Sequence, residues 1–542
     1  MIRPLDAQVV RDTMPAWLTW VPAPAPIGRV YRWLAGRATP ERVVVALATV
    51  LCIGFYAWYT QRGLTLAYAD AISHLMIARR VVAARTPGLG QLGGDWLPLP
   101  HLLMLPLIWI PEFWRDGFAG ALPSMVAYVI GSLYMYRLGS RLVASQAAGL
   151  TAALAYMLNP SMLYMQATAM TEVSLTGAIV VAIYYAVCWA QTHRAAELVK
   201  TAAAVATATA VRYDGWAVAA TVALIVIGVA WRHGGRIYAE ANALLFGVLG
   251  FAGCMAWMLY NQVIFGNALK FFNGSTSAQG QFKRDVKTLE TYHNPLLSLH
   301  IYSQASLDMF WWPLVALALL GLVWWMVRHR LDIQTLPVYA ILAPFVFNWA
   351  SMVYGISGIR TPEIALGGYR TYFNERLVLV MMPAVALFLA FLASRHRLLA
   401  ITVSALILLF VGFGSFQGTP YVLQDPLHGL SHDGFVRDPQ GGKWLATHYH
   451  GGNVLTSGAP FEPLMFYSKL PDHIFITDAD AVEFPAALAQ PQRHVTWIMM
   501  ASRSANDDVV WDSLSRRRDW RRYFVLRHVI GTAQFYERAG GS

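Results

Sequence analysis

Long runs of apolar residues, each ended by a short polar stretch, recur along most of the first 415 residues of the chain. A helix that crosses a lipid bilayer needs roughly 20 mostly apolar residues. On that rule the pattern predicts about eleven spanning helices, over residues 42–60, 118–136, 147–160, 169–190, 198–212, 214–231, 241–264, 310–327, 336–354, 375–394 and 398–415. The chain is therefore expected to be a mainly α-helical, polytopic membrane bundle.

The pattern changes after about residue 416, where charged residues return. Four short β-rich runs read NVLTSG, HIFIT, VTWIMM and YFVLRHVIG. A helix-like stretch, VVWDSLSRRRDW, lies between the last two runs. We therefore expect three parts: a cytoplasmic N-terminal segment over residues 1–41, a transmembrane domain over residues 42–415, and a small α/β domain over residues 416–542.

The loops between the expected spans fall into two alternating classes. The short loops carry arginine and lysine, whereas the longer loops at about 61–117, 265–309 and 355–374 are mixed in charge. Cytoplasmic loops of membrane proteins carry the excess of lysine and arginine. We therefore expect the N-terminus inside the cell, and the long loops and the C-terminal domain outside the cytoplasm.

Composition supports a membrane protein over a soluble one. The chain is 56% hydrophobic and only 13% charged, whereas a soluble domain is about 25% charged. Its net charge of +11 would suit a protein that binds nucleic acid. However, most of the arginines lie between apolar runs, which is the pattern of a membrane topology signal. We therefore expect no nucleic-acid partner. The three cysteines lie inside apolar runs and have the spacing of neither a disulfide framework nor a metal site.

The first outer loop begins with an acid in the stretch LTLAYADAISHLMIARR. Asp70 follows the first span, His74 comes one helical turn later, and residues 70–85 follow the spacing of an amphipathic helix on the membrane surface. Asp70 also suits a helix N-terminus, where a negative charge meets the helix dipole, so a capping role stays open. The next apolar run, over residues 97–110, is interrupted by three prolines and cannot be a regular span; His101 within it is either a packed or a functional histidine.

Ionisable side chains also gather at the outer ends of later spans. Glu172 in QATAMTEVSL begins one span, Arg212 and Asp214 in AVRYDGW flank a junction, and Arg376 in YFNERLVLV begins another. Such residues at membrane depth are costly and are functional candidates by default. The alternative is that they pair and lock helices together, Arg212 with Asp214 or Glu172, and Arg376 with Glu375.

The loop over residues 265–309 is long enough to act as a lid or a substrate loop. Its basic residues could meet an anionic substrate or could simply be solvated: Lys270, Lys283, Arg284, Lys287 and His293. The full set of candidate substrate-binding residues is His74, Arg79, His101, Glu172, Arg212, Asp214, Lys270, His293, Tyr369, Arg370 and Arg376.

This layout resembles the GT-C glycosyltransferases, in particular the protein O-mannosyltransferase and lipid A aminoarabinose transferase group. The resemblance covers about residues 42–415 and rests on AYADAISHL, MLNPSMLYMQATAMTEVSL, AVRYDGW and YFNERLVLVMMPAVAL. It implies a polyprenyl-phosphate-linked sugar as donor, an extracytoplasmic glycan, lipid or protein as acceptor, and inversion at the sugar carbon. It also implies a multi-pass protein of the bacterial cytoplasmic (inner) membrane in contact with membrane lipids, with Asp70 as the catalytic base. Asp70 is followed by Ala71 rather than by the second acid of the O-mannosyltransferases, which weighs against a protein acceptor.

The chemistry of such a transfer fits these residue types. An attacking acceptor hydroxyl needs a base, and a carboxylate within hydrogen-bond reach can serve. The lipid phosphate departs as an anion and needs positive charge, which Arg376, Arg370 or Lys270 could supply. A divalent metal ion held in part by Asp70 and His74 stays possible on the sequence. The other function classes are a membrane transporter or lipid flippase with a one-sided polar cavity, and a non-catalytic scaffold.

Overall fold

The computed structural model describes residues 39–274, 277, 280, 290–417, 419–480, 482–502 and 508–540. The chain from residue 44 onward forms one compact unit. Most of the expected N-terminal segment, residues 1–38, lies outside the described residues. The expected domain boundary near residue 416 stays a prediction.

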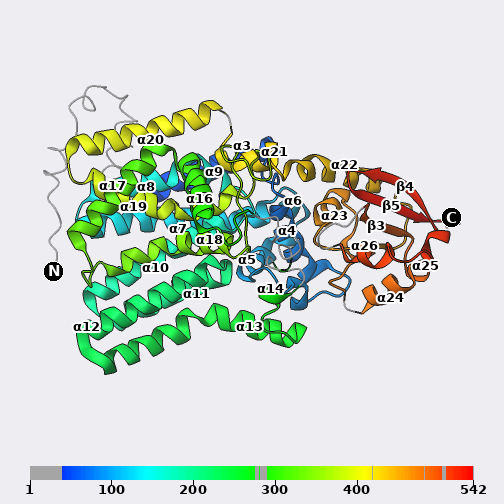
Figure 1. Cartoon of the computed structure of the whole chain (residues 1–542), viewed down its shortest axis with the longest axis horizontal. Coiled ribbons are helices and arrows are strands. Elements are labelled where there is room, and N and C mark those ends of the chain that lie inside the picture. The colour runs from blue at the N-terminus through cyan, green and yellow to red at the C-terminus, as the bar shows by residue number, and fades with distance from the viewer. Residues whose placement is uncertain are drawn as a thin grey trace, which may run out of the picture. The chain divides into compact units, whose positions relative to one another are not determined.

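Within the described chain, seven helical elements are long and apolar enough to cross a membrane (Figure 1). They are α3 (Pro40–Gln61), α7 (Phe118–Val143), α10 (Glu172–Thr192), α12 (Asp214–Gly250), α17 (Trp312–His329), the pair η4 and α18 (Leu336–Leu342 and Ala343–Val353), and the pair η5 and α19 (Glu375–Met381 and Met382–Ala393). The prediction of a mainly α-helical, polytopic membrane fold is confirmed.

The other expected spans fall on shorter helices or on a helix described only in part. These are α8 (Gln146–Met157), α11 (Ala195–Val211), α13 (Ala252–Phe265) and α20 (Arg397–Gln417). Within α12 the chain is not continuously helical, because Gly235 has φ 71° and ψ −163°. Glycine adopts this left-handed region without a Cβ clash, which allows the helix to break there. Two spans that the sequence separates therefore belong in part to one element.

Shorter helices connect the spans. They are α4 (Ala69–Ala83), η2 (Leu89–Leu92), α5 (Leu99–Ile108), α6 (Pro111–Arg115), α9 (Pro160–Met165), α14 (Lys270–Asn273) and α16 (Pro295–Phe310). The proline-interrupted run forms α5, which has ten residues and is too short to cross a bilayer. The first outer loop contains the expected helix, α4, but every residue from Ala71 to Ala78 is buried. α4 is therefore covered by protein on more sides than an amphipathic surface helix needs.

The C-terminal region contains a five-stranded sheet of order β2-β1-β3-β5-β4 (Figure 1). Its strands are β1 (Val454–Thr456), β2 (Phe475–Ile476), β3 (Trp497–Ala501), β4 (Phe524–Ile530) and β5 (Ala533–Arg538). β1 runs parallel to β2 and β3, whereas β5 runs antiparallel to β3 and β4. The β-rich runs predicted from sequence form β1 to β4. The sequence analysis missed β5, because polar residues interrupt the apolar pattern of AQFYER.

Helices cover this sheet and join it to the rest of the chain. They are η6 (Tyr421–Leu423), α21 (Gln424–His428), α22 (His432–His448), α23 (Glu462–Ser468), η7 (Asp472–Ile474), α24 (Glu483–Ala489), α25 (Pro491–His494), α26 (Val509–Leu514) and η8 (Trp520–Arg522). The predicted mixture of helices and strands in the C-terminal region is confirmed.

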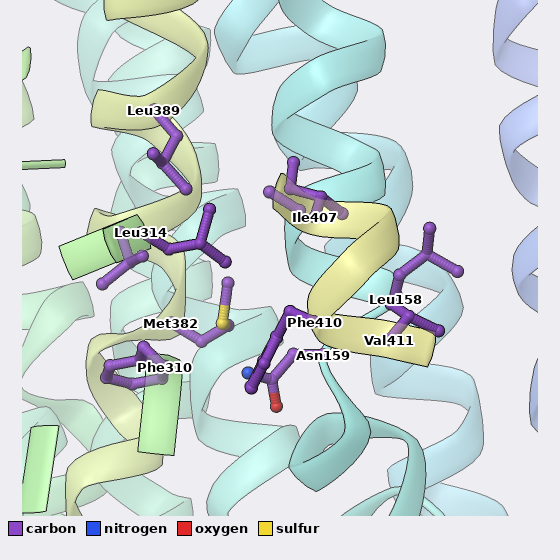
Figure 2. A pocket seen from close by; sticks show the side chains of 11 residues that line it. Leu158, Asn159, Phe310, Leu314, Met382, Leu389, Ile407, Phe410 and Val411 are labelled. Carbon is purple, nitrogen blue, oxygen red and sulfur yellow. The ribbon is translucent and has the colours of Figure 1, made fainter. Parts of the chain in front are cut away.

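A small cavity lies among the membrane helices α8, α17, α19 and α20 (Figure 2). Leu314, Leu389 and Phe410 are among its lining residues, and Asn159 is the polar member of the set. The side-chain oxygen of Asn159 already accepts hydrogen bonds from the backbone at the start of α9. Because none of the eleven lining residues is ionisable, the charged chemistry must lie elsewhere.

The membrane helices α17 and α19 approach closely at Gly321. A Cβ atom at this position would clash with the backbone oxygen of Phe388 on α19. Small residues at helix–helix contacts let the two backbones pack closely in a membrane. Gly228 on α12, in contrast, has open space where a Cβ would stand.

These two glycines give a matched test of helix packing. Gly321→Ala should destabilise the protein by about 1–3 kcal/mol, because α17 and α19 must move apart. Gly228→Ala should leave stability unchanged or slightly raised, since alanine favours a helix over glycine. Thermal unfolding of the purified variants in detergent measures both effects. Equal unfolding midpoints for the two variants would contradict this packing.

Candidate functional site

Five charged side chains meet where several membrane helices begin. We name them the charged cluster: Asp70, Glu172, Arg212, Asp214 and Arg376. Each of the three acids lies in the first turn of its helix, α4, α10 or α12. The positive end of a helix dipole favours a carboxylate at that place. The ends of these helices therefore bring together residues that are up to 306 positions apart in the sequence.

Arg376 connects the exposed edge of the cluster to its buried part. Its Nη2 donates to Oδ2 of Asp70 and, at 3.1 Å, to the side-chain oxygen of Asn374. Its Nη1 lies 3.6 Å from Oε1 of Glu172. The guanidinium also stands 5.1 Å from the centre of the Tyr68 ring, a distance at which a cation is attracted to the ring face. Arg376 thus contacts the start of α4 and the start of α10 at once.

Arg212 lies between two buried acids. Its Nη1 is 3.0 Å from Oε1 of Glu172, and its Nε is 3.2 Å from Oδ2 of Asp214. Thr171 accepts a further hydrogen bond from Nη1 at 3.2 Å. Asn348 on α18 donates to the other oxygen of Asp214 at 2.8 Å. The sequence offered the pairing of Arg212 with Asp214 or Glu172 as an alternative, and the structure shows both ion pairs.

The other pairing offered by the sequence, between Arg376 and Glu375, is wrong. Oε1 of Glu375 accepts instead from the backbone N–H of Phe373 at 3.1 Å. Neighbouring residues on a helical turn point in different directions and do not face each other. Arg376 is therefore free to reach Asp70 across the gap between elements.

Exposure distinguishes Asp70 from the other acids of the cluster. Its side chain is 40% exposed, whereas those of Glu172 and Asp214 are 0% and 3% exposed. Three carboxylates and two guanidinium groups leave one net negative charge. Within the cluster, Asp70 is the carboxylate that a molecule from outside can approach.

His74, one turn further along α4, pairs with another histidine. Its Nδ1 lies 2.9 Å from Nε2 of His101 on α5, and its ring packs 4.3 Å from that of Trp96. Burial lowers the pKa of His74 to about 3, with help from the charges of Arg376 and Arg212. Burial also lowers the pKa of His101, and His74 contributes to the shift. Both imidazoles are therefore neutral at pH 7.

The described residues do not gather a metal-binding set around Asp70 and His74. Across the described ranges, no group of three or more His, Cys, Asp or Glu side chains is arranged to hold a metal ion. Asp70 is engaged by Arg376, and His74 is engaged by His101. Two such ligands are too few for a protein metal site, so we derive no step through a metal.

Two other candidates lie near the first outer loop but outside the charged cluster. Arg79, at the other end of α4, pairs with Asp472 of the C-terminal region at 3.1 Å. Lys270, on α14, stands 3.5 Å from the centre of the Phe265 ring, and its side chain lies directly against Gly94. Neither cation contacts the cluster.

The remaining candidates lie on the surface. His293 is exposed, and its backbone N–H donates to the oxygen of Val353 at 2.8 Å. The side chain of Tyr369 is 76% exposed. Arg370 donates to two backbone oxygens of the turn at 362–363, each at 2.9 Å. The candidates Lys283, Arg284 and Lys287 lie outside the described residues.

Sequence reasoning missed several polar partners of the cluster. Asn348 lies in the apolar run PFVFNWASMV, where a single amide was the available signal, because polar side chains in membrane helices find partners on other helices. Tyr68 and Thr171 carry no charge, and they stand two residues before Asp70 and one residue before Glu172 in the sequence. Only the folded chain shows that they contact the two arginines.

Comparisons with known proteins identify the fold. No family model matches the chain, and no curated protein matches it. Its structure is similar to that of ArnT from Cupriavidus metallidurans bound to undecaprenyl phosphate, with 12% identity, a TM-score of 0.55, and coverage of 92% of this chain and 98% of that one. The apo structure of the same ArnT aligns with 13% identity, a TM-score of 0.54, and coverage of 89% and 97%.

An oligosaccharyltransferase from Archaeoglobus fulgidus, solved in complex with Zn and sulfate, aligns more weakly. Its identity is 11% and its TM-score 0.47, over 84% of this chain and 68% of that one. At these identities the likeness to ArnT, a lipid A aminoarabinose transferase, shows the fold, which is of the GT-C type. The family resemblance stated from sequence is confirmed at the level of the fold.

Removing Arg212 should destabilise the protein more than removing a surface arginine. In Arg212→Met, Glu172 and Asp214 lose a buried partner, which should cost about 3–5 kcal/mol. Arg370→Met is the matched control, since Arg370 is exposed and should matter by less than about 0.5 kcal/mol. Thermal unfolding in detergent measures both variants, and similar midpoints would contradict the bridging role of Arg212.

The histidine pair should make stability depend on pH. The unfolded pKa of histidine is about 6.5, so between that value and the folded pKa the unfolded state binds more protons. The contribution of these neutral histidines to the free energy of unfolding is therefore complete above about pH 6.5 and is lost as the pH falls. For His74 the loss reaches about 2 kcal/mol at pH 5.

The variant His74→Gln/His101→Gln tests this dependence, because it removes both titrating groups. Its unfolding midpoint should fall less between pH 7.5 and pH 5 than that of the wild type. His293→Gln, which changes an exposed histidine, should keep the wild-type dependence. A double variant with an unchanged pH dependence would show that the pair does not titrate in this window.

Proposed function

We propose that this protein is an integral membrane glycosyltransferase of the GT-C type. It moves a sugar from a polyprenyl-phosphate donor to an acceptor on the extracytoplasmic side of the bacterial cytoplasmic membrane. The fold supports this assignment, because the similar ArnT structure was solved bound to undecaprenyl phosphate. The seven apolar helices of the described chain also support it, because they are long enough to cross a membrane. The main support is the charged cluster, in which Asp70 is accessible beside a buried arginine.

In the proposed reaction, Asp70 acts as the general base. The acceptor hydroxyl oxygen attacks the anomeric carbon of the sugar, and its proton passes to a carboxylate oxygen of Asp70. The bond from that carbon to the phosphate oxygen breaks, and the electron pair leaves with the polyprenyl phosphate. Attack opposite the leaving phosphate inverts the configuration. A positioned base of this kind contributes about 10²–10⁴-fold in rate.

Arg376 is the group best placed to meet the departing phosphate. A guanidinium has five N–H donors and can contact a carboxylate and a phosphate at the same time. Arg376 already reaches Asp70 at the exposed edge of the cluster, whereas Arg212 is engaged by Glu172 and Asp214. We therefore assign charge stabilisation to Arg376 and the support of the two buried acids to Arg212.

Trp96 of the first outer loop, with Tyr213 and Phe271 from later segments, forms an aromatic wall that adjoins the cluster through His74 on α4 and through Tyr213 next to Arg212. Trp96 packs on the neutral ring of His74. The Tyr213 hydroxyl donates a hydrogen bond at 2.7 Å to the backbone oxygen of Asp95, the residue before Trp96. The Tyr213 ring stacks on Phe271 with centroids 5.3 Å apart. We assign contact with the sugar to this wall, because it combines aromatic faces with neutral hydrogen-bonding groups.

Asp70→Asn should abolish transfer without unfolding the protein. The amide keeps the size of the side chain but cannot take the proton, so turnover should fall by at least about 10²-fold. The measurement incubates purified protein with a panel of undecaprenyl-phosphate sugars and with glycan, lipid or protein acceptors, and follows release of the lipid phosphate and glycosylation of the acceptor. Asp433→Asn is the matched control, because the Asp433 side chain is 77% exposed and lies in the C-terminal region.

Near-normal turnover of Asp70→Asn would remove the catalytic assignment. Movement of lipid or solute in proteoliposomes, without any glycosylated product, would instead favour the transporter or flippase alternative. The donor in the panel that the wild-type protein consumes identifies the sugar, and the product identifies the acceptor class.

A further inference from the structure

The helix that carries Asp70 is attached at its other end to the C-terminal region. α4 holds Asp70 and His74 in its first half and Arg79 and Arg80 near its C-terminal end. A helix rises 1.5 Å per residue, so Asp70 and Arg80 lie about 15 Å apart along the axis. Because a short helix moves as a rigid unit, a displacement at one end also displaces the other.

Arg80 forms an ion pair with Glu462, the first residue of α23. The two side chains are only 13% and 5% exposed. Glu462 lies at the start of its helix, where the helix dipole favours a carboxylate. Removal of either partner would leave a buried charge without its counterpart, so this pair holds α4 to α23 firmly.

Arg79 forms a second link to the same region. Its Nε is 3.1 Å from Oδ2 of Asp472, and its Nη1 donates to the backbone oxygen of Ile108 at 2.9 Å. Its guanidinium lies 5.3 Å from the centre of the Trp114 ring, which meets Phe466 of α23 edge-on at 4.9 Å. Arg79 therefore connects α4, the α5–α6 segment and the C-terminal region at one point.

The segment that follows α4 continues this polar contact. Arg85 pairs with Glu483 at 2.6 Å, and its Nη1 donates to Asn453 at 3.1 Å. A small cavity lies between α4 and the C-terminal region, with Gln91 and Arg80 in its lining. Oε1 of Gln91 and Nε of Arg80 are buried and have no hydrogen-bond partner among the residues that the structure describes. Charged pairs and a cavity with polar groups in its lining thus add to the apolar packing of α4 against this region.

We propose that the C-terminal α/β region positions the catalytic base through α4, with Arg80–Glu462 and Arg79–Asp472 as the positioning pairs. The proposal rests on the function proposed above for Asp70. The two pairs hold the far end of the helix, and Arg376 holds the near end at Asp70. The distance from Asp70 to the reacting hydroxyl therefore depends on contacts about 15 Å away.

Glu462→Gln tests the first pair, because glutamine keeps the shape of the side chain and removes its charge. A small misplacement of a catalytic group can cost about 10²-fold in rate. We expect the turnover number to fall by roughly 10-fold to 10²-fold, with the KM for the donor changed by less than about twofold. Binding of undecaprenyl phosphate should stay near the wild-type value. The thermal midpoint should fall, because Arg80 loses its buried counterpart, so turnover is measured per folded protein below that midpoint.

Glu537→Gln is the matched control. Glu537 pairs with Arg527 at 2.8 Å inside the C-terminal sheet, and its partner is half exposed. This variant also removes one carboxylate from an ion pair of the same region, but at a distance from α4. Turnover should stay at the wild-type level. A second variant, Asp472→Asn, tests the link through Arg79 and serves in case Glu462→Gln does not fold.

The outcomes separate this proposal from the proposed function. If Asp70→Asn is inactive while Glu462→Gln and Asp472→Asn keep wild-type turnover, the positioning role is overturned and the base assignment stands. If Asp70→Asn keeps near-normal turnover, the base assignment fails, and if the wild-type protein transfers no sugar, the proposed function itself fails. A loss of turnover that only follows loss of folded protein, with the remaining protein fully active, would also overturn the positioning role.

Discussion

Two arginines hold three carboxylates where membrane helices begin, and the rest of the site depends on that arrangement. An ionised group at membrane depth is costly unless it is paired. Glu172 is fully buried and lies near both Arg212 and Arg376, so this single carboxylate joins the start of α10 to the α12 and η5 elements. Arg376 in turn holds Asp70 in position through their ion pair.

The cluster combines a rigid part with an accessible part. Glu172 and Asp214 are enclosed and paired, whereas Asp70 lies at the edge and reaches solvent. A catalytic carboxylate needs both properties, because it must be held in one geometry and must still meet a substrate. Its helix, α4, is held at one end by Arg376 and at the other by acids of the C-terminal region.

Much of this architecture could be predicted from local patterns. Apolar run length located the membrane helices, and β-rich runs located β1 to β4, because both signals depend on residues close together in sequence. The pattern failed where one element contains two runs, as in α12 around Gly235. It also failed for β5, whose polar residues are tolerated because the neighbouring strands β3 and β4 supply its pairing.

The candidate site could likewise be predicted from the sequence only in part. Charge patterning predicted that Asp70, Glu172, Arg212, Asp214 and Arg376 lie at helix ends on one side of the membrane, and the tertiary structure brings these five together. It does not bring Arg79, His293, Tyr369 or Arg370 to the cluster, although the sequence predicts them on the same side of the membrane. Residues in one loop can face different neighbours, and only the packing of helices decides which ones meet.

The amino-acid sequence by itself predicted a polytopic helical membrane protein, most of its helices, four of its five described strands, and which residue types carry charge at the helix ends of the cluster. Each of these follows from composition and short-range periodicity. The tertiary structure alone decided that Arg376 pairs with Asp70 rather than with Glu375, that His74 faces His101, and that α4 is bound to the C-terminal region. Those contacts join residues 27 to 382 positions apart, so no local pattern contains them.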